Sequence, residues 1–317
     1  MNHIPVELAA PDISRHAKGN TGIDFVHTFE SGRPGPHVMV NAITHGNEIC
    51  GAIAVDGLLA MGVRPTRGTL TLSFANVDAF QRFDPARPYA TRFIDEDFNR
   101  VWRPEILDGS RDSIELRRAR ALRPAVDAAD FLLDIHSMLE PSPPVMICGP
   151  LDKGIGFAFD VGIPHFIVTD EGHANGTRMR DYGGFGDPSS PRNALLVECG
   201  QHWERAAETV AWQTTWRFLR QLDVVDPDLA AREIDGTSPS AQRLVRVTDA
   251  VVARTPSFRF AKAFGGMEIV PKAGDPIAYD GDAVVRAPYD DCVLVMPVPN
   301  NVKTGLTAVR LGRIESR

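Results

Sequence analysis

The alternation of two apolar patterns along the first two-thirds of the chain constrains the fold most. Short runs rich in β-branched residues alternate with segments in which apolar residues recur every three or four positions. The first pattern is typical of buried strands and the second of amphipathic helices. Together they predict an α/β fold, with a mainly parallel, mixed sheet flanked by helices.

The expected elements follow from these patterns. Strands are expected over residues 25–29, 37–43, 69–75, 131–135, 144–148, 166–169 and 194–199, and helices over 47–61, 113–128 and 203–222. Beyond residue 223 the chain becomes rich in Asp, Gly, Ser and Pro, which indicates a boundary. Short strands are then expected at 244–252, 277–279, 283–285, 292–296 and 307–311. We therefore predict an α/β domain over residues 1–238 and a small all-β domain, a sandwich or barrel, over 239–317.

Charge and apolar content exclude several classes of protein. The chain has 34 Lys and Arg against 41 Asp and Glu, a net charge of -7, and no segment concentrates the basic residues. Nucleic acid is therefore not an expected partner. The first 20 residues are polar, and no later apolar run reaches the ~20 residues of a membrane span. We expect a cytoplasmic protein with no membrane contact, whose four separated cysteines are buried free thiols.

The segment from Asn41 to Glu48 carries the strongest chemical signal. An apolar strand ends in His45, turns through Gly46 and opens a helix with Glu48. Sites in open α/β sheets form at the carboxyl ends of strands, where a His and a Glu at this spacing can face one metal ion. A third ligand is needed, and the best candidate is His136, which ends a second apolar run. Three ligands and an open fourth position are the pattern of catalytic zinc.

Two carboxylates accompany these residues. Asp134 lies two positions before His136, on the same face of the strand, where it could orient a metal ligand or an arginine. Glu198 ends a buried strand, where a lone carboxylate is costly unless it has a partner or a task. A structural pair with an arginine is one explanation. A metal-bound water that needs a base is the other.

Each of these residues also has a purely structural explanation. His45 alone fits a hydrogen-bonded turn, and Glu48 fits a carboxylate stabilised by the start of a helix. Arg92 and Arg100 lie in an acidic loop, where solvated ion pairs are common. Asn99 fits the cap of a turn. Only their combination points to a functional site.

Four segments in order resemble one family. They are His45-Gly-Asn-Glu48, Arg92-Phe-Ile-Asp-Glu-Asp-Phe-Asn-Arg100, Asp134-Ile-His136, and Glu198 followed by Gly200. This set is similar to the succinylglutamate desuccinylase/aspartoacylase family, a branch of the zinc carboxypeptidase-like fold. The resemblance covers the whole α/β part. The β-rich tail agrees with the small C-terminal domain that the family carries.

The resemblance implies a role for each matched residue. One zinc ion per chain would be held by His45, Glu48 and His136, with Glu198 as general base, Arg92 polarising the scissile carbonyl, and Asn99 and Arg100 holding a substrate carboxylate. The implied reaction is hydrolysis of a linear amide in a small N-acyl amino acid or related metabolite, by Glu-assisted attack of zinc-bound water. A metallocarboxypeptidase acting on a peptide and a non-catalytic zinc-containing binding protein are the alternatives. The sequence leaves a homo-oligomer open.

The chain departs from the family where substrate is selected. Aspartate-specific members use a tyrosine near the chain end, and an arginine and a tyrosine shortly before the catalytic glutamate. Here Tyr289 lies in a different setting, while Arg178, Arg180 and Tyr182 precede Glu198 at a looser spacing. The Gly-rich loop 171–186 is where specificity residues are expected, and its His173 could reach a substrate. The acyl group and the amino acid therefore remain open.

Overall fold

One large sheet organises the computed structural model, which describes residues 4–172, 175–236, 241–300 and 302–315. In spatial order its strands are β1 (Val26–Glu30), β3 (Thr69–Phe74), β2 (His37–Ala42), β4 (Phe131–Met138), β7 (Asn193–Gln201), β5 (Val145–Ile147), β6 (Phe166–Thr169), β8 (Arg243–Val252), β14 (Thr307–Glu315), β13 (Cys292–Val295) and β10 (Glu268–Val270). All seven strands expected in the α/β part are confirmed, with ends shifted by a few residues.

The direction of the strands changes along the sheet. From β3 to β8 the neighbours are parallel, except that β5 runs antiparallel to β7. β1 is an antiparallel edge strand, and in the order β8, β14, β13, β10 each strand runs antiparallel to the next. The predicted mainly parallel, mixed sheet is therefore confirmed. The central strands β2, β4 and β7 are buried almost throughout, because helices cover both of their faces.

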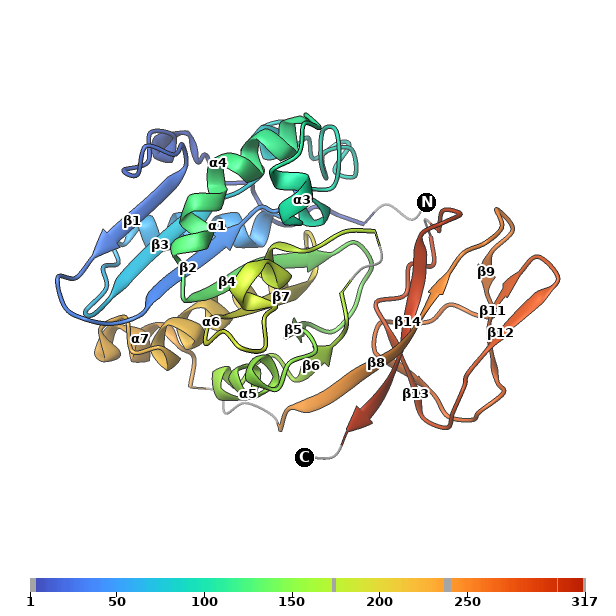
Figure 1. Ribbon diagram of the computed structural model, residues 1–317. Helices are drawn as coiled ribbons and strands as arrows, with labels where there is room; N and C mark the ends of the chain where they lie inside the picture. Colours follow the sequence, from blue (N-terminus) through green and yellow to red (C-terminus); the bar gives the residue numbers. More distant parts are fainter. Residues whose placement is uncertain (1–3, 173–174, 237–240, 301, 316–317) are drawn as a thin grey trace.

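The helices form two layers (Figure 1). One apolar core joins the sheet to α1 (Ile49–Ala60), α5 (Asp152–Val161), α6 (Arg205–Gln221) and α7 (Pro227–Glu233). A second core joins the opposite face to α3 (Pro104–Leu107) and α4 (Ile114–Ala128). The three expected helices are confirmed as α1, α4 and α6, whereas α5 was not predicted. No helix in the described ranges has the length and apolar content needed to cross a membrane.

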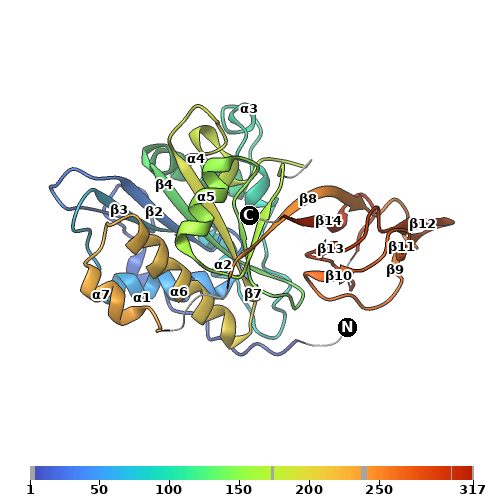
Figure 2. The same cartoon turned by 90° about the horizontal axis from the view of Figure 1, so that it is seen from below.

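The C-terminal strands extend away from the α/β part (Figure 2). Strands β9 (Arg259–Phe260), β11 (Pro276–Asp280) and β12 (Ala283–Arg286) form a separate three-stranded sheet, which shares an apolar core with β10, β13 and β14 of the main sheet. β8 pairs with β6, so the main sheet continues into the β-rich part. The predicted boundary at residue 238 falls within 237–240, outside the described residues.

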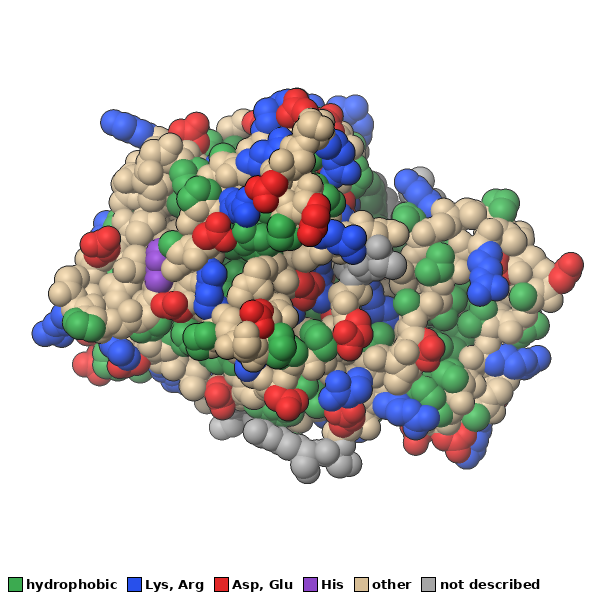
Figure 3. All heavy atoms as spheres, in the orientation of Figure 1, with side chains coloured by type: hydrophobic (Ala, Val, Ile, Leu, Met, Phe, Trp, Pro, Cys, Tyr) green, Lys and Arg blue, Asp and Glu red, His purple; other side chains and the backbone are tan. Residues whose placement is uncertain are grey.

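The charged side chains are mixed on the surface, and the cysteines are buried. On the face shown in Figure 3, basic and acidic side chains are interspersed rather than gathered by sign. All four cysteines lie in the described ranges and are buried free thiols, as predicted: Cys50, Cys148, Cys199 and Cys292.

Candidate metal centre

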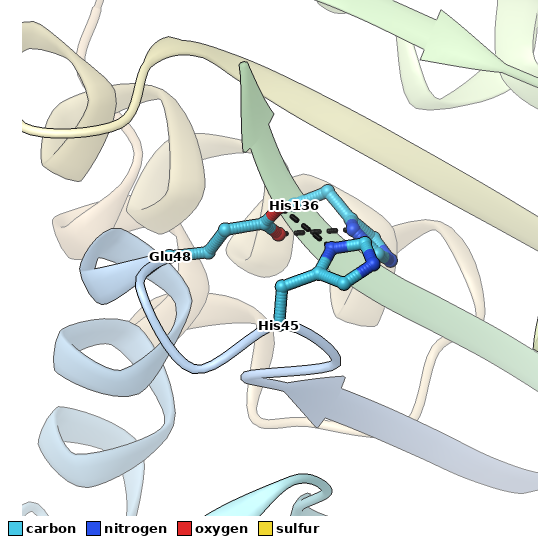
Figure 4. Close-up of side chains that lie close together, drawn as sticks. All are labelled: His45, Glu48 and His136. Carbon is cyan, nitrogen blue, oxygen red and sulfur yellow. Dashed lines mark hydrogen bonds and ion pairs between the residues drawn. The ribbon is translucent and has the colours of Figure 1, made fainter. Parts of the chain in front are cut away.

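Three buried side chains meet at the carboxyl ends of β2 and β4 (Figure 4). His45 follows β2, Glu48 is the residue directly before α1, and His136 lies on β4. The Glu48 carboxylate lies between the two imidazoles, with its Oε1 2.7 Å from Nδ1 of His45 and its Oε2 2.9 Å from Nδ1 of His136. One ligand atom from each residue lies within 4.8 Å of the other two. The structure thus brings together the three residues that the sequence predicted as ligands.

The turn that presents His45 is tightly packed. Ile43, directly after β2, has φ 52, a left-handed conformation that is unusual for a β-branched residue and that turns the chain sharply. The Gly46 N–H donates to the carbonyl of Arg92 at 3.0 Å. A Cβ at Gly46 would lie 2.4 Å from the carbonyl oxygen of Thr91. Glycine is therefore required for the His45 turn to lie against the loop that carries Arg92.

Asp134 orients His136. Its Oδ2 accepts from Nε2 of His136 at 2.7 Å, while its Oδ1 accepts from Asn41 and Thr44, both at 2.8 Å. Burial alone would raise the pKa of Asp134, but His136 and these hydrogen bonds hold it below its ordinary value. A proton kept on Nε2 leaves Nδ1 of His136 free to bind a metal. The sequence analysis gave Asp134 two possible partners, a metal ligand or an arginine. The contact observed is to the predicted ligand His136.

Asp97 orients His45 in the same way, a role that the sequence analysis did not assign. Its Oδ1 lies 3.0 Å from Nε2 of His45 and also accepts from the backbone N–H of Asn99 at 2.9 Å. Burial opposes the charge on Asp97, yet His45 and the nearby guanidinium of Arg92 hold its pKa well below the ordinary value. The sequence did contain one indication of this role, because Asp97 lies within the segment that resembles the family, five residues after Arg92.

The three residues fit a divalent cation. Two imidazole nitrogens and one carboxylate are donors that suit zinc, and each ring has its other nitrogen held by a carboxylate. Burial would raise the pKa of Glu48, but the two imidazoles lower it well below its ordinary value, so this carboxylate is anionic. A buried carboxylate with two imidazole nitrogens beside it is a donor set that favours a cation.

Glu198, predicted as the general base, stands next to this group. Parallel pairing of β4 and β7 places it opposite His136, so the two side chains share a face of the sheet. The residue is 8% exposed, and among the described residues its Oε2 has no hydrogen-bond partner. Burial raises the pKa of Glu198 to about 8. This carboxyl group can therefore exchange a proton near neutral pH.

Arg92 reaches the same group from the loop before η2 (Phe98–Arg100). Its guanidinium lies 3.5 Å from Oε1 of Glu48 and 3.4 Å from Oδ2 of Asp97. Another contact joins Nη2 of Arg92 to Nε2 of His45 at 2.9 Å. Because its side chain is 37% exposed, the guanidinium can also meet a ligand.

A buried carboxylate holds this loop in place. Glu115, in the first turn of α4, is fully buried and accepts from three successive backbone N–H groups, those of Ile94, Asp95 and Glu96, at 2.7, 3.1 and 3.2 Å. Sequence periodicity places Glu115 on a helix but gives no sign of this contact. These three hydrogen bonds to Glu115 fix the segment between Arg92 and Asp97.

The two predicted carboxylate-binding residues lie in η2. Oδ1 of Asn99 accepts from the backbone N–H of Met179 at 3.0 Å, and Nη1 of Arg100 donates to the carbonyl of Asn99 at 2.7 Å. Burial lowers the pKa of Arg100 to about 10, which leaves it charged at neutral pH. Both residues line the same cavity as the metal-binding group.

This cavity has a volume of about 800 Å³. Arg178 is among the described residues that line it, whereas Arg180, Tyr182 and Tyr289 are not. The first two of these are buried elsewhere in the α/β part, and Tyr289 packs in the C-terminal part. His173 lies outside the described residues.

Comparison with known proteins agrees with the fold and identifies the family. Residues 34–205, more than half of the chain, match the succinylglutamate desuccinylase/aspartoacylase catalytic domain. The chain belongs to this family, whose named activities are deacylations, and the resemblance drawn from the four segments is confirmed. A comparison with curated proteins finds no match.

Three solved structures illustrate the likeness of fold. A succinylglutamate desuccinylase/aspartoacylase from Rhodobacter sphaeroides is 16% identical, with a TM-score of 0.67 over 92% of this chain and 89% of that one. A succinylglutamate desuccinylase from Vibrio cholerae is 16% identical, with a TM-score of 0.65 over 92% and 86%. The ectoine utilization protein EutE (DoeB) from Ruegeria pomeroyi is 16% identical, with a TM-score of 0.63 over 90% and 88%.

Proposed function

We propose that this chain is a zinc-dependent hydrolase that cleaves the amide bond of a small N-acyl amino acid or related metabolite. One observation carries the proposal: the group formed by His45, Glu48 and His136 lies beside the buried Glu198, inside a cavity. Membership of a deacylase family supports it. The three residues would hold one zinc ion per chain, and a bound zinc ion polarises a carbonyl and lowers the pKa of a coordinated water to about 7.

The chain's own residues supply the proton transfers. Glu198 takes the proton of the attacking water as the bond from water oxygen to carbonyl carbon forms. It then passes a proton to the amine as the C–N bond breaks. The pKa of Glu198, about 8 without a metal, would be lowered by a cation held by Glu48 and the two histidines, and more of the carboxyl group would then be present as the base.

Arg92, Asn99 and Arg100 orient the substrate in this proposal. The guanidinium of Arg92, whose side chain is 37% exposed, donates to the developing oxyanion. Arg100 presents a planar fork to a substrate carboxylate, and Asn99 holds the adjoining loop at Met179.

A small substrate is favoured over a peptide. The cavity is partly walled by the C-terminal part of the chain, through residues 295–298, 302–303, 306–307 and 310. These segments restrict the approach of a long chain to the metal-binding group. A metallocarboxypeptidase and a non-catalytic zinc-containing protein remain the alternatives that the experiment must separate.

Release of primary amine from a panel of N-acetyl, N-succinyl and N-formyl amino acids tests the proposal. We expect turnover of at least one member, with loss of turnover after chelation and recovery when zinc is restored. A zinc-loaded protein that cleaves peptides and none of the panel would support the carboxypeptidase. A zinc-loaded protein that cleaves neither would support the binding protein.

A further inference from the structure

Besides the candidate metal centre, the cavity holds a second group of charged side chains. Three arginines from distant parts of the chain line it: Arg100 in η2, Arg178 in the loop 171–186 and Arg310 on β14. Burial lowers the pKa of Arg100 to about 10, and the positive charges of Arg178 and Arg310 contribute to this shift. Burial and the charge of Arg178 also lower the pKa of Arg310. The three guanidinium groups therefore lie close enough to repel one another.

The carboxylates beside this group are engaged chiefly by Arg178. Both Nη atoms of Arg178 donate to Asp170, at 3.0 and 2.6 Å, and its Nε donates to Asp181 at 2.5 Å. Asp181 also accepts from Arg180, and Asp170 forms an ion pair with Arg310. Within the described residues, these ion pairs join three arginines to two carboxylates. Positive charge is therefore in excess at this end of the cavity.

Arg310 is brought to the cavity by the C-terminal part of the chain. It lies on β14, which pairs with β8, and β8 pairs with β6, the strand that Asp170 directly follows. The Arg310 side chain is 11% exposed, and its Nε lies 3.9 Å from Oδ2 of Asp170. Burial lowers the pKa of Arg310, whereas the charges of Asp170 and Glu198 raise it. The guanidinium therefore lies within electrostatic reach of the proposed base.

Arg310 and Arg178 differ in what they can offer a ligand. All three guanidinium nitrogens of Arg178 donate to carboxylates of the protein, and its side chain is only 2% exposed. Arg310 is the more exposed of the two and shares Asp170 with Arg178 at the longer distance. A ligand carboxylate beside Arg310 would balance the excess charge and leave the ion pairs of Arg178 intact.

We infer that Arg310 is a specificity-determining residue, which binds an anionic group on the limb of the substrate that Arg100 does not hold. This inference rests on the proposed function and deepens it. The substrate then carries a second carboxylate, recognised by a strand of the C-terminal part rather than by the loop 171–186. That carboxylate belongs either to the side chain of the amino acid or to the acyl group. Both present a planar anion that a guanidinium binds with two hydrogen bonds.

Pairs of isosteric substrates separate these two sources. For the side chain, the pairs are N-acetylaspartate with N-acetylasparagine and N-acetylglutamate with N-acetylglutamine. For the acyl group, the pair is N-succinylglycine with its amide, N-succinamoylglycine. For each compound we would measure kcat and KM of the zinc-loaded full chain and, by calorimetry, the Kd of the metal-free chain. We expect the charged member of one kind of pair to have a kcat/KM at least about tenfold higher, and that kind of pair identifies the limb.

Variants at two positions of β14 test the residue itself. Arg310→Gln removes a charge from the cavity, whereas Arg313→Gln removes one from an exposed side chain that stacks on the ring of Tyr289. We expect Arg310→Gln to lower the preference for the charged member at least about tenfold, through KM and the calorimetric Kd rather than kcat. Arg313→Gln should keep this preference within about twofold. Arg310→Lys keeps the charge without the two-point contact, so its loss should be smaller, about threefold.

The outcomes distinguish this inference from the function on which it rests. Equal or faster hydrolysis of the uncharged members of all pairs would overturn the role of Arg310 and leave the deacylase standing. Equal loss of preference in Arg310→Gln and Arg313→Gln, with both folded by circular dichroism, would do the same. If Arg310→Gln does not fold, an unchanged preference in Arg310→Lys would overturn the two-point contact. If the zinc-loaded chain hydrolyses no compound, the proposed function fails, and the calorimetric preference of the metal-free chain still decides whether Arg310 binds the carboxylate.

Discussion

Replacement of Asp134 by asparagine should loosen the metal without unfolding the chain. Asp134 uses both oxygens, one for Nε2 of His136 and one for Asn41 and Thr44. An asparagine has a single acceptor oxygen, so its NH₂ group must face either the His136 N–H or two other donors. His136 then loses the partner that fixes its tautomer, and Nδ1 is no longer held ready for the metal.

The magnitude follows from the kind of contact that is lost. Carboxylates that orient a ligating histidine contribute 10–100-fold to metal affinity, which corresponds to about 1.4–2.7 kcal/mol. We therefore expect the zinc Kd of Asp134→Asn to rise by about 10–100-fold. Competition with a chromophoric chelator measures this change directly.

The matched control is Asp130→Asn, at the other end of β4. Asp130 accepts the backbone N–H of His37 at 2.8 Å and lies far along the strand from the ligands. Its replacement should leave the zinc Kd within about twofold. Equal Kd values for wild type and Asp134→Asn, with both proteins folded by circular dichroism, would refute the role assigned to Asp134.

Three other changes have definite expected results. Gly46→Ala forces a Cβ against the Thr91 carbonyl and should lower the free energy of unfolding by about 1–3 kcal/mol in urea titration. Glu115→Gln weakens the anchor of the Arg92 loop, so kcat/KM should fall at least about tenfold while bound zinc stays unchanged; unchanged kcat/KM would contradict this role. Between pH 4.5 and about 8, folded metal-free protein keeps a proton on Glu198 that the unfolded chain has lost, so this group lowers stability as pH rises. Metal-free Glu198→Gln should therefore gain Tm over metal-free wild type as pH goes from 5 to 8, and a constant difference would show that Glu198 is not protonated.

The sequence was sufficient for the features that depend on local pattern. His45 and His136 each end an apolar run, and parallel strands bring such ends to one edge of the sheet, so their meeting could be predicted. The spacing from His45 to Glu48 placed both on one turn. The strands and long helices of the α/β part followed from apolar periodicity in the same way.

Long-range packing was beyond the sequence. Glu115 and the loop at Ile94 meet only because α4 packs over that loop, and a helix position alone does not reveal such a contact. The Gly154 and Gly156 positions obscured α5, since glycine is a poor helix former. The pairing of β6 with β8, far apart in sequence, joins the β-rich part to the main sheet. No local pattern specifies that pairing.

The central claim is that Glu198 acts as the base beside a metal held by His45, Glu48 and His136. The most direct test is Glu198→Gln, with zinc content and amine release measured on the same sample. We predict one zinc per chain, as in wild type, and hydrolysis at least about a hundredfold slower. Hydrolysis at the wild-type rate with zinc bound would contradict the claim.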